Sequence, residues 1–253
     1  MKKIFSIVLM LGYLLSGATL WANGLQVAPT SLNISADHQA TELWLSSTAQ
    51  IDNPPPMTAQ IRVFKWIQTE NKDRLISTSD IVVSPPFVTI TKKVAQLIRI
   101  VRSQENKIVN QKNPSDEISY RIIVDEIPTQ DTHTPGLQFV MHYSIPLFVQ
   151  PQSAKNQVIQ LSKENLAWHF VKKDNKVLLQ VINNGPIHIQ LMDVNFSNKT
   201  TTKNISHGLL GYVLPHSQME WKTNLKPENI LSGGMISLTL NGKEHVTVPI
   251  TTQ

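Results

Sequence analysis

The 253-residue sequence predicts an all-β protein built from β-sandwiches. Short segments rich in β-branched and aromatic residues recur about every ten residues along the chain. Turn clusters such as "DNPPP", "SPP" and "NQKNPSDE" separate these segments, and no segment keeps a helical period with capping residues. Strands at this spacing, with no helices between them, favour sandwiches over a parallel sheet.

The first 22 residues are typical of a cleaved secretory signal peptide. Lys2 and Lys3 precede an apolar stretch over residues 4–15, and small residues follow, which predicts cleavage after Ala18 or Ala22. An uncleaved membrane anchor is the alternative, although the apolar stretch is shorter than the about 20 residues that span a bilayer. We therefore expect an exported protein.

Two domains are expected after the signal peptide, over residues 23–150 and 151–253, and the mature chain suffices for two domains of about 115 residues each. The strand-like segments of the first half are residues 43–45, 59–67, 87–90, 96–102 and 120–127. After "VQPQS" the same pattern resumes, and Asp174-Asn175 and Asn241-Gly242 predict hairpin turns between apolar runs.

Charge and cysteine content limit the partners and the means of stabilisation. The formal net charge of +5 falls to +3 when the two lysines of the signal peptide are removed, and no basic run exceeds a pair of residues. We therefore expect no nucleic-acid partner. Cysteine is absent, so this exported chain is expected to be stable without disulfides.

The sequence shows no pattern of a catalytic or metal site. Nucleophile-elbow, phosphate-loop, dinucleotide and zinc-protease motifs are all missing, and the eight histidines lack the spacing that lets two share a metal. Asp125 and Glu126 are adjacent on a predicted strand, so they point to opposite faces and cannot act as a carboxylate pair. We expect no enzymatic activity, no cofactor and no metal; a metal held by distant histidines is the alternative.

The segment "GLQFVMHYSIPLFVQP" predicts a long strand with an open edge. One face alternates as Leu137, Phe139, Met141, Tyr143, Ile145, Leu147 and Val149. Pro146 cannot donate to a strand ladder, so at least one side of the strand is expected to be unpaired. The segment also lacks the charges that usually protect an edge strand, which suits it for adding a strand to a partner. A central strand with a bulge at Pro146 is the alternative.

Several segments, in order, resemble the periplasmic pilus-assembly chaperones of the PapD-like type, and the resemblance covers essentially the whole mature chain. They are "SPPFVTITKKVAQLIRI" with its basic Arg99, "YRIIVDEIP" with Tyr120, Glu126, Ile127 and Pro128, and "LQFVMHYSIPLFVQP" as the donor strand. The second half, with "LAWHF", "VINNGPIH" and "GYVLPHSQMEW", resembles the archaic branch, whose subunits are similar to spore-coat-type pilins.

The resemblance implies two immunoglobulin-like sandwiches in a boomerang arrangement and a periplasmic chaperone. Its donor strand, at about residues 137–147, would complete a pilin subunit that lacks its own last strand, until an outer-membrane usher accepts the subunit. The inserted side chains are expected to be Leu137, Phe139, Met141 and Tyr143. When no pilin is bound, we expect the edge to be shielded by self-association or by the loop "TQDTHTPG".

One feature departs from the family. Well-studied members grip the pilin's C-terminal carboxylate with an arginine in the first strand and a lysine near the end of the donor strand. Here the lysine position is Pro146, and the first strand offers only Thr30 or Ser31. Arg99 and Arg121, in strands expected to lie near the donor strand, are the candidate carboxylate anchors. The alternative is that both are solvated strand charges.

Two other classes of function fit a β-sandwich protein. One is an exported adhesin or carbohydrate-binding module, which would need a cluster of exposed aromatic residues. The five tryptophans are spread singly along the sequence, and one of them, Trp21, lies in the signal peptide. The other is an exported hydrolase, for which the sequence shows neither a triad nor a metal-ligand spacing.

Overall fold

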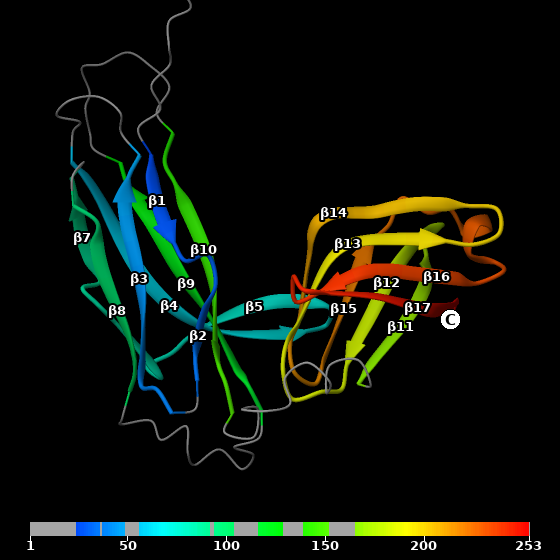
Figure 1. The fold of residues 1–253 in the computed structure, drawn as a ribbon, viewed down its shortest axis with the longest axis horizontal. Helices are drawn as coiled ribbons and strands as arrows, with labels where there is room; N and C mark the ends of the chain where they lie inside the picture. Colours follow the sequence, from blue (N-terminus) through cyan, green and yellow to red (C-terminus); the bar gives the residue numbers. More distant parts are fainter. Residues whose placement is uncertain are drawn as a thin grey trace, which may run out of the picture.

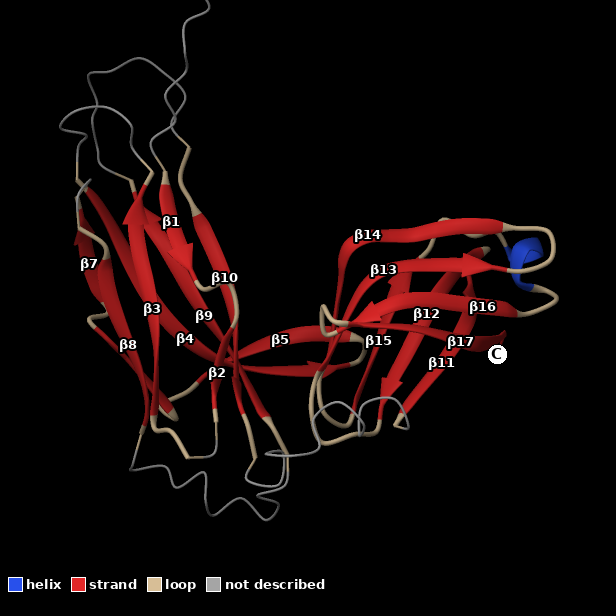
Figure 2. Cartoon of the chain, viewed as in Figure 1, coloured by secondary structure: helices blue, strands red, loops and turns tan. Residues whose placement is uncertain are grey.

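The structure, a computed structural model, describes residues 24–35, 37–48, 56–91, 94–103, 116–128, 139–151 and 165–252. These residues form two β-sheet bodies that meet at one end and open into an angle (Figure 1). Within this part of the chain the only helix drawn is the short 3-10 helix η3 (Pro227–Ile230), in the second body (Figure 2). The predicted all-β fold with two immunoglobulin-like sandwiches is confirmed.

The first body is a sandwich of two sheets. Its four-stranded sheet has the order β1 (Leu25–Ala28), β3 (Ala40–Ser47), β8 (Gln96–Arg102), β6 (Ile81–Ser84). Its second sheet has the order β2 (Leu32–Ile34), β10 (His142–Val149), β9 (Ile118–Ile127), β4 (Met57–Thr69), β5 (Lys72–Ser77), and β7 (Phe87–Ile90) also pairs with β4. The chain thus changes sheets between β1 and β2.

The core of this body follows the period of two that its strands show in the sequence. β8 buries Ile98 and Ile100 and exposes Leu97 and Arg99, while β9 buries Tyr120, Ile122 and Val124 toward the same core. Burial raises the pKa of the Tyr120 hydroxyl far above its usual value, and the hydrogen bond to Asp80 acts in the same direction. The phenol therefore serves as a neutral donor inside the sandwich.

The second body is one continuous sheet that folds over on itself. Its strand order is β14 (Thr202–Val213), β13 (Ile189–Ser197), β16 (Gly234–Leu240), β17 (Glu244–Thr252), β11 (Leu166–Lys173), β12 (Lys176–Asn183), β15 (Ser217–Lys222). β17 pairs with β16 from Glu244 to Ile250 but with β11 only at Thr251 and Thr252, so the layer turns over there and encloses a second core.

Both predicted hairpin turns are present. Asp174 and Asn175 join β11 to β12, and Asn241 and Gly242 begin the turn from β16 to β17. All four residues have positive φ, the backbone conformation that Asn, Asp and Gly adopt most readily. The last strand of the first body ends at Val149 and the next described strand begins at Leu166, so the division at residue 150 stays a prediction.

The predicted signal peptide lies outside the described residues. Within the part of the chain that the structure describes, no helix has the length and apolar character needed to cross a membrane.

Candidate functional site

The strand β10 is paired along its whole length on one side and along only part of it on the other. β9 pairs with residues 142–149 in antiparallel register, whereas β2 pairs only with Leu147, Phe148 and Val149. Among the described strands, none pairs with the second side of residues 142–146. The predicted open edge therefore exists, but it ends at Pro146 because β2 covers the last three residues.

The hydrogen-bond pattern explains how a proline fits this strand. The amide of Glu126 donates to the carbonyl of Met141, its register partner, so odd-numbered residues of β10 direct their backbone groups toward β9. Even-numbered residues, His142, Ser144 and Pro146, then direct theirs toward the open side. The N–H that proline lacks would have faced this side, so Pro146 removes no bond of the ladder to β9.

The residues before β10 form an exposed apolar stretch. Phe139 is 78% exposed, Val140 45% and Met141 36%, and none of the three belongs to a described strand. The amide of Met141 donates to the Glu126 side chain, which extends the contact with β9 by one residue. Exposed apolar side chains next to an open edge are a combination that monomeric proteins usually avoid. Leu137, the fourth predicted donor residue, lies outside the described residues.

Tyr143 lies differently from the other predicted donor residues. Its ring packs against the core of the first body and its hydroxyl donates to the carbonyl of Leu25 in β1. Burial raises the pKa of this hydroxyl, so it remains a donor at neutral pH. Tyr143 thus bridges the edge of β10 to the edge of β1, the outermost strand of the other sheet.

The second half of β10 is buried on both faces. Ile145, Leu147 and Val149 point into the core of the first body, and Phe148 points outward into a separate cluster with Trp66 and Leu214, beside Tyr212. Leu214 and Tyr212 belong to the second body, so this cluster is the apolar centre of the joint. The sequence signal for it was the unbroken apolar run "IPLFV", since both faces of a strand read apolar when both are covered.

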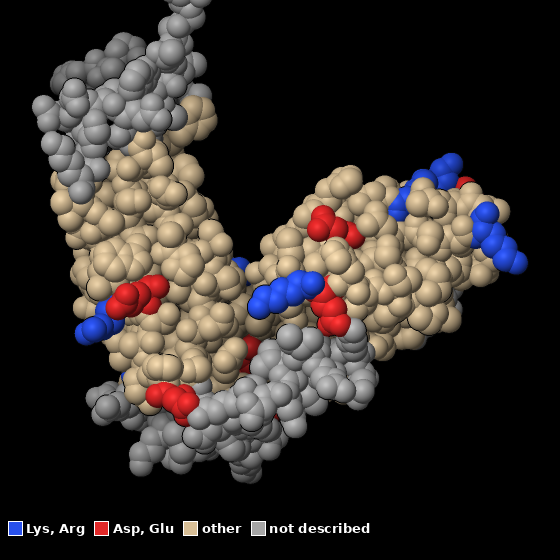
Figure 3. All heavy atoms as spheres, in the orientation of Figure 1, with Lys and Arg blue, Asp and Glu red and all other residues tan. Residues whose placement is uncertain are grey.

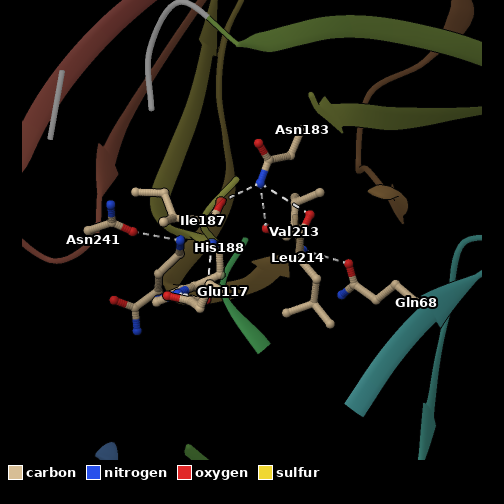
Figure 4. Close-up of polar contacts among 9 residues, drawn as sticks. Gln68, Glu117, Asn183, Ile187, His188, Val213, Leu214 and Asn241 are labelled. Atoms are coloured by element: carbon tan, nitrogen blue, oxygen red, sulfur yellow. Dashed lines mark hydrogen bonds and ion pairs between the residues drawn. The ribbon is translucent and has the colours of Figure 1, made fainter. Parts of the chain in front are cut away.

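Polar contacts hold the joint around this cluster (Figure 4). The Gln68 side chain accepts a hydrogen bond from the amide of Leu214 at 2.8 Å and donates to the carbonyl of Tyr212 at 2.9 Å. The Glu117 carboxylate, which is buried, accepts from Nδ1 of His188 at 2.6 Å and from the His188 amide at 3.2 Å. Sequence reasoning missed Gln68, Glu117 and His188, because no local pattern links residues so far apart in the chain.

Asn183 fixes the segments of the second body that reach the joint. Its side-chain amide, fully buried at the end of β12, donates to the carbonyls of Ile187, Val213 and Leu214 (Figure 4). Its Oδ1 accepts from the amide of Gly185, and because the NH2 group has only two hydrogens, the three carbonyls share its donors. The loops that carry His188 and Leu214 are thereby tied together before they contact the first body.

The structure separates the two candidate anchor residues. Arg121 lies in β9, opposite Pro146 in the register, whereas Arg99 lies in β8 of the other sheet and points to solvent. Since Ile98 and Ile100 on either side of Arg99 are buried in the core, the Arg99 side chain projects into solvent from the outer face of its sheet. The expectation that both strands lie near the donor strand is correct for Arg121 and wrong for Arg99.

Arg121 is enclosed by aromatic rings at the joint. Its guanidinium carbon lies 3.7 Å from the centre of the Trp66 ring and 5.6 Å from that of Tyr212, and Nη1 is 3.4 Å from the carbonyl of Ser144. Burial lowers the pKa of Arg121, but an arginine remains charged at any physiological pH. It forms no ion pair within the described part of the chain, so a partly desolvated cation stands at the end of the open edge.

A second charged group lies on the same face, nearer the start of β10. Asp125 accepts hydrogen bonds from Arg62 at 2.6 Å and from His142 at 2.5 Å. Burial alone would raise the pKa of Asp125, but these two bonds outweigh it and the pKa falls below its usual value. Glu126, the next residue, turns to the other side as predicted and bonds Met141 instead. The two acids therefore do not form a carboxylate pair.

The angle between the bodies is open to solvent, and the surface of the first body beside it shows few charged side chains in Figure 3. No group of three metal-ligating side chains occurs among the described residues. Of the tryptophans in those residues, Trp66 and Trp168 are buried, Trp221 is half-buried and Trp44 is exposed. The described surface thus lacks the tryptophan cluster that a carbohydrate-binding module would need.

Comparison with known proteins gives matches of two kinds. Residues 24–155, just over half of the chain, match the sequence model of the PapD N-terminal domain, described as a pili and flagellar-assembly chaperone. No curated protein sequence matches the chain.

Among solved structures, a chain of the CsuC–CsuE chaperone–tip adhesion subunit complex, from the archaic Csu pili of Acinetobacter baumannii, is 28% identical with a TM-score of 0.65. The match covers 91% of this chain and 99% of that chain. The YadV chaperone is 18% identical, with coverage of 89% and 98% and a TM-score of 0.62. A chain of the Salmonella enterica complex of SafA pilin with the SafB chaperone is 17% identical, with coverage of 92% and 98% and a TM-score of 0.60. The last two likenesses bear on the fold alone.

Proposed function

This chain belongs to the family of pili and flagellar-assembly chaperones, and on that premise we propose that it binds incomplete pilin subunits by adding its own strand to them. Strand addition supplies backbone hydrogen bonds along an edge and side chains for the pockets of the partner. The similar Csu complex pairs a chaperone with a tip adhesion subunit, and the similar Salmonella complex pairs a chaperone with a pilin. A pilin-type subunit is therefore the client that we propose.

The observation that carries this proposal is the unpaired side of β10 beside an exposed apolar stretch. His142 and Ser144 direct N–H and C=O groups to that side, and Phe139 and Met141 stand exposed just before them. We propose that the pilin pairs with residues 137–144 and that pairing stops at Pro146, which offers no N–H. Leu137, Phe139 and Met141 would enter the client, whereas Tyr143 would remain the bridge to Leu25.

We propose Arg121 as the anchor for the client's terminal carboxylate. A client strand whose pairing stops at Pro146 would end near the Arg121 guanidinium, because Arg121 is the register partner of Pro146 and its Nη1 lies 3.4 Å from the carbonyl of Ser144 on the open side. A carboxylate there would form charge-assisted hydrogen bonds with a guanidinium that has no ion-pair partner among the described residues. Arg99 faces away from this position, so we assign it no part in client binding.

The proposed setting follows from the family and from the predicted signal peptide. We propose that the protein works in the periplasm and hands its client to an outer-membrane usher. Without a client, the open edge and the exposed Phe139 would favour self-association. Sedimentation of the free protein should then show a dimer that dissociates when a pilin is added, and a strict monomer at every concentration would argue against this point.

Co-expression in a bacterial periplasm tests the function. The protein should co-purify with a pilin-type subunit and protect it from proteolysis, and the double variant Phe139→Asp/Met141→Asp should do neither. Leu231→Asp is the control, because Leu231 is an apolar residue of the second body that is about as exposed as Phe139. If the double variant protects the subunit as well as the control does, the client binds elsewhere. If no pilin-type subunit is stabilised by the unchanged protein, the proposed function is wrong.

A further inference from the structure

The core-facing side of β10 does not by itself define the register of this strand. Tyr143, Ile145, Leu147 and Val149 all point toward the first core, and Met141 precedes them at the same spacing. A shift that moves every residue two positions toward the end of the strand would therefore replace each of these side chains with another large apolar one. Shifts by an even number keep every side chain on its own face, so the core discriminates weakly against them.

The outer side of β10 carries side chains that cannot replace one another. It presents His142, Ser144, Pro146 and Phe148 in turn, and only Phe148 fills a closed aromatic pocket, where it is 1% exposed. Its ring stacks on His188 with centroids 3.4 Å apart and planes 5° apart, and it contacts Trp66 and Tyr212 at 6.2 and 5.8 Å. A shift by two residues would put Pro146 or Gln150 in this pocket.

The second body supplies most of that pocket. His188 and Tyr212 belong to it, and the His188 ring is held in place by the buried carboxylate of Glu117. The amide of Glu117 in turn donates to the carbonyl of Pro186 at 2.8 Å. The segment before β9 and the segment before β13 thus each donate a backbone hydrogen bond to the other. Two other side-chain contacts depend on the register: His142 with Asp125, which is largely exposed and therefore weaker, and the Tyr143 hydroxyl with the carbonyl of Leu25 at the edge of β1.

We propose that the second domain sets the register of β10 by holding Phe148, and that His188 is the positioning residue. The consequence for client binding rests on the proposed function: the register decides which backbone groups of residues 142–146 face the open side. It also fixes how far Phe139 extends beyond the end of β9. The second domain would thus act on the client through the strand.

Engineered disulfides can report the register in the free protein, because the chain contains no cysteine of its own. Ser144 and Ile123 are opposite each other and form a non-hydrogen-bonded pair, whose Cα atoms lie about 4.5 Å apart, within the range of a disulfide. Ile123→Cys with Ser144→Cys therefore traps the observed register. Ile123→Cys with His142→Cys traps the register that is shifted by two residues and places Pro146 in the pocket.

We expect the first pair to oxidise readily and the second pair hardly at all in the otherwise unchanged protein. His188→Ala should raise the fraction of the shifted disulfide by about tenfold, as the loss of one aromatic contact implies. His188→Phe, which keeps a stacked ring, should restore the original distribution. Gln68→Ala is the matched control, since it removes two other polar contacts of the joint and leaves His188 stacked on Phe148.

The proposal is overturned if His188→Ala leaves the shifted disulfide as rare as before, or if Gln68→Ala raises it equally. Should His188→Ala fail to fold, Phe148→Leu keeps an apolar side chain but removes the stack, and it should raise the shifted disulfide as well. No client is needed for these measurements. A failure here therefore leaves the proposed function standing, and a failure to bind pilin leaves this result standing.

Discussion

The two halves of β10 differ in how far they are buried and in how many neighbouring strands they pair with. Residues 145–149 are buried on both faces and are paired partly on both edges, whereas residues 142–144 are half-exposed and have one described partner strand. The core-facing residues of "HYSIPLFV" are apolar or aromatic in both halves, whereas the outward-facing residues change from His142 and Ser144 to Pro146 and Phe148. This change follows what covers the strand: β2 reaches only as far as Leu147, and the second body covers Phe148.

This contrast shows how one strand can be firmly held and still be available to a partner. Local stability varies along a fold, and segments with few buried contacts open at low free-energy cost. Anchoring one end of β10 in two cores allows the other end to keep free hydrogen-bonding groups without loss of the fold. The four predictions that follow test this contrast, from the largest expected effect to the smallest.

The largest effect is expected in the buried half. Leu147→Ala removes a side chain that is fully buried in the first core, which should lower the free energy of unfolding by about 2–5 kcal/mol. Urea denaturation, followed by tryptophan fluorescence, measures this. The matched variant Phe139→Ala, in the exposed stretch, should change the same quantity by less than about 0.5 kcal/mol. Equal losses in both variants would show that the two halves do not differ in stability.

The second effect concerns binding, to which the exposed stretch should contribute although it contributes little to stability. Phe139→Ala and Met141→Ala should each weaken pilin binding by about 1.5–3 kcal/mol, the gain from burying a large apolar side chain, while leaving the fold intact. Calorimetric titration with a pilin that co-purifies would give the affinities. Leu231→Ala, about as exposed as Phe139 but on the second body, serves as the control. Unchanged affinity of both variants would contradict the assignment of this stretch as the donor segment.

The sequence predicted the open edge of β10, but not the strand that covers the end of this edge. Alternation and Pro146 were sufficient for an edge strand, because both act locally along the chain. The covering strand is β2, which is only three residues long and pairs in parallel with a segment more than a hundred residues away in the sequence. No local pattern indicates such a pairing. The placement of Tyr143 needed the carbonyl of Leu25, a contact between two sheets that no periodicity encodes.

The same reasoning explains the two arginines. A basic residue in a strand pattern shows that its side chain faces out of the core, but not which sheet or which side of the sandwich it faces. Arg99 and Arg121 therefore looked equivalent in the sequence, and only the strand order separates them. The joint was also out of reach, since Glu117 and His188 lie 71 positions apart and meet only when both bodies are in place.

The third prediction uses this separation of the arginines. Arg121→Ala should weaken pilin binding by about 1.5–3 kcal/mol, the usual cost of losing a hydrogen bond to a charged group, whereas Arg99→Ala should leave the affinity unchanged. A pilin with an amidated C-terminus should bind Arg121→Ala and the unchanged protein equally. If Arg121→Ala lowers the thermal midpoint and not the affinity, Arg121 supports the joint and does not anchor the client.

The smallest effect concerns the charged group at the exposed end of β10. The pKa of Asp125 in the folded protein is lowered by its bonds to Arg62 and His142, so these bonds stabilise the fold above the unfolded-state pKa of about 3.9 and are lost as the pH falls through the lower folded value. Because Arg62 and His142 are largely exposed, the contribution at pH 7 should stay below about 1 kcal/mol.

Asp125→Asn removes this contribution, so the variant should be slightly less stable than the unchanged protein at pH 7 and equally stable near pH 2. Urea unfolding at both pH values measures the difference. Because the group lies on the open half, hydrogen exchange should quicken at Tyr143, whose backbone groups face β9, but not at Phe148. Faster exchange at Phe148 as well would mean that β10 opens as one unit, and the contrast between its halves would then be one of exposure and not of stability.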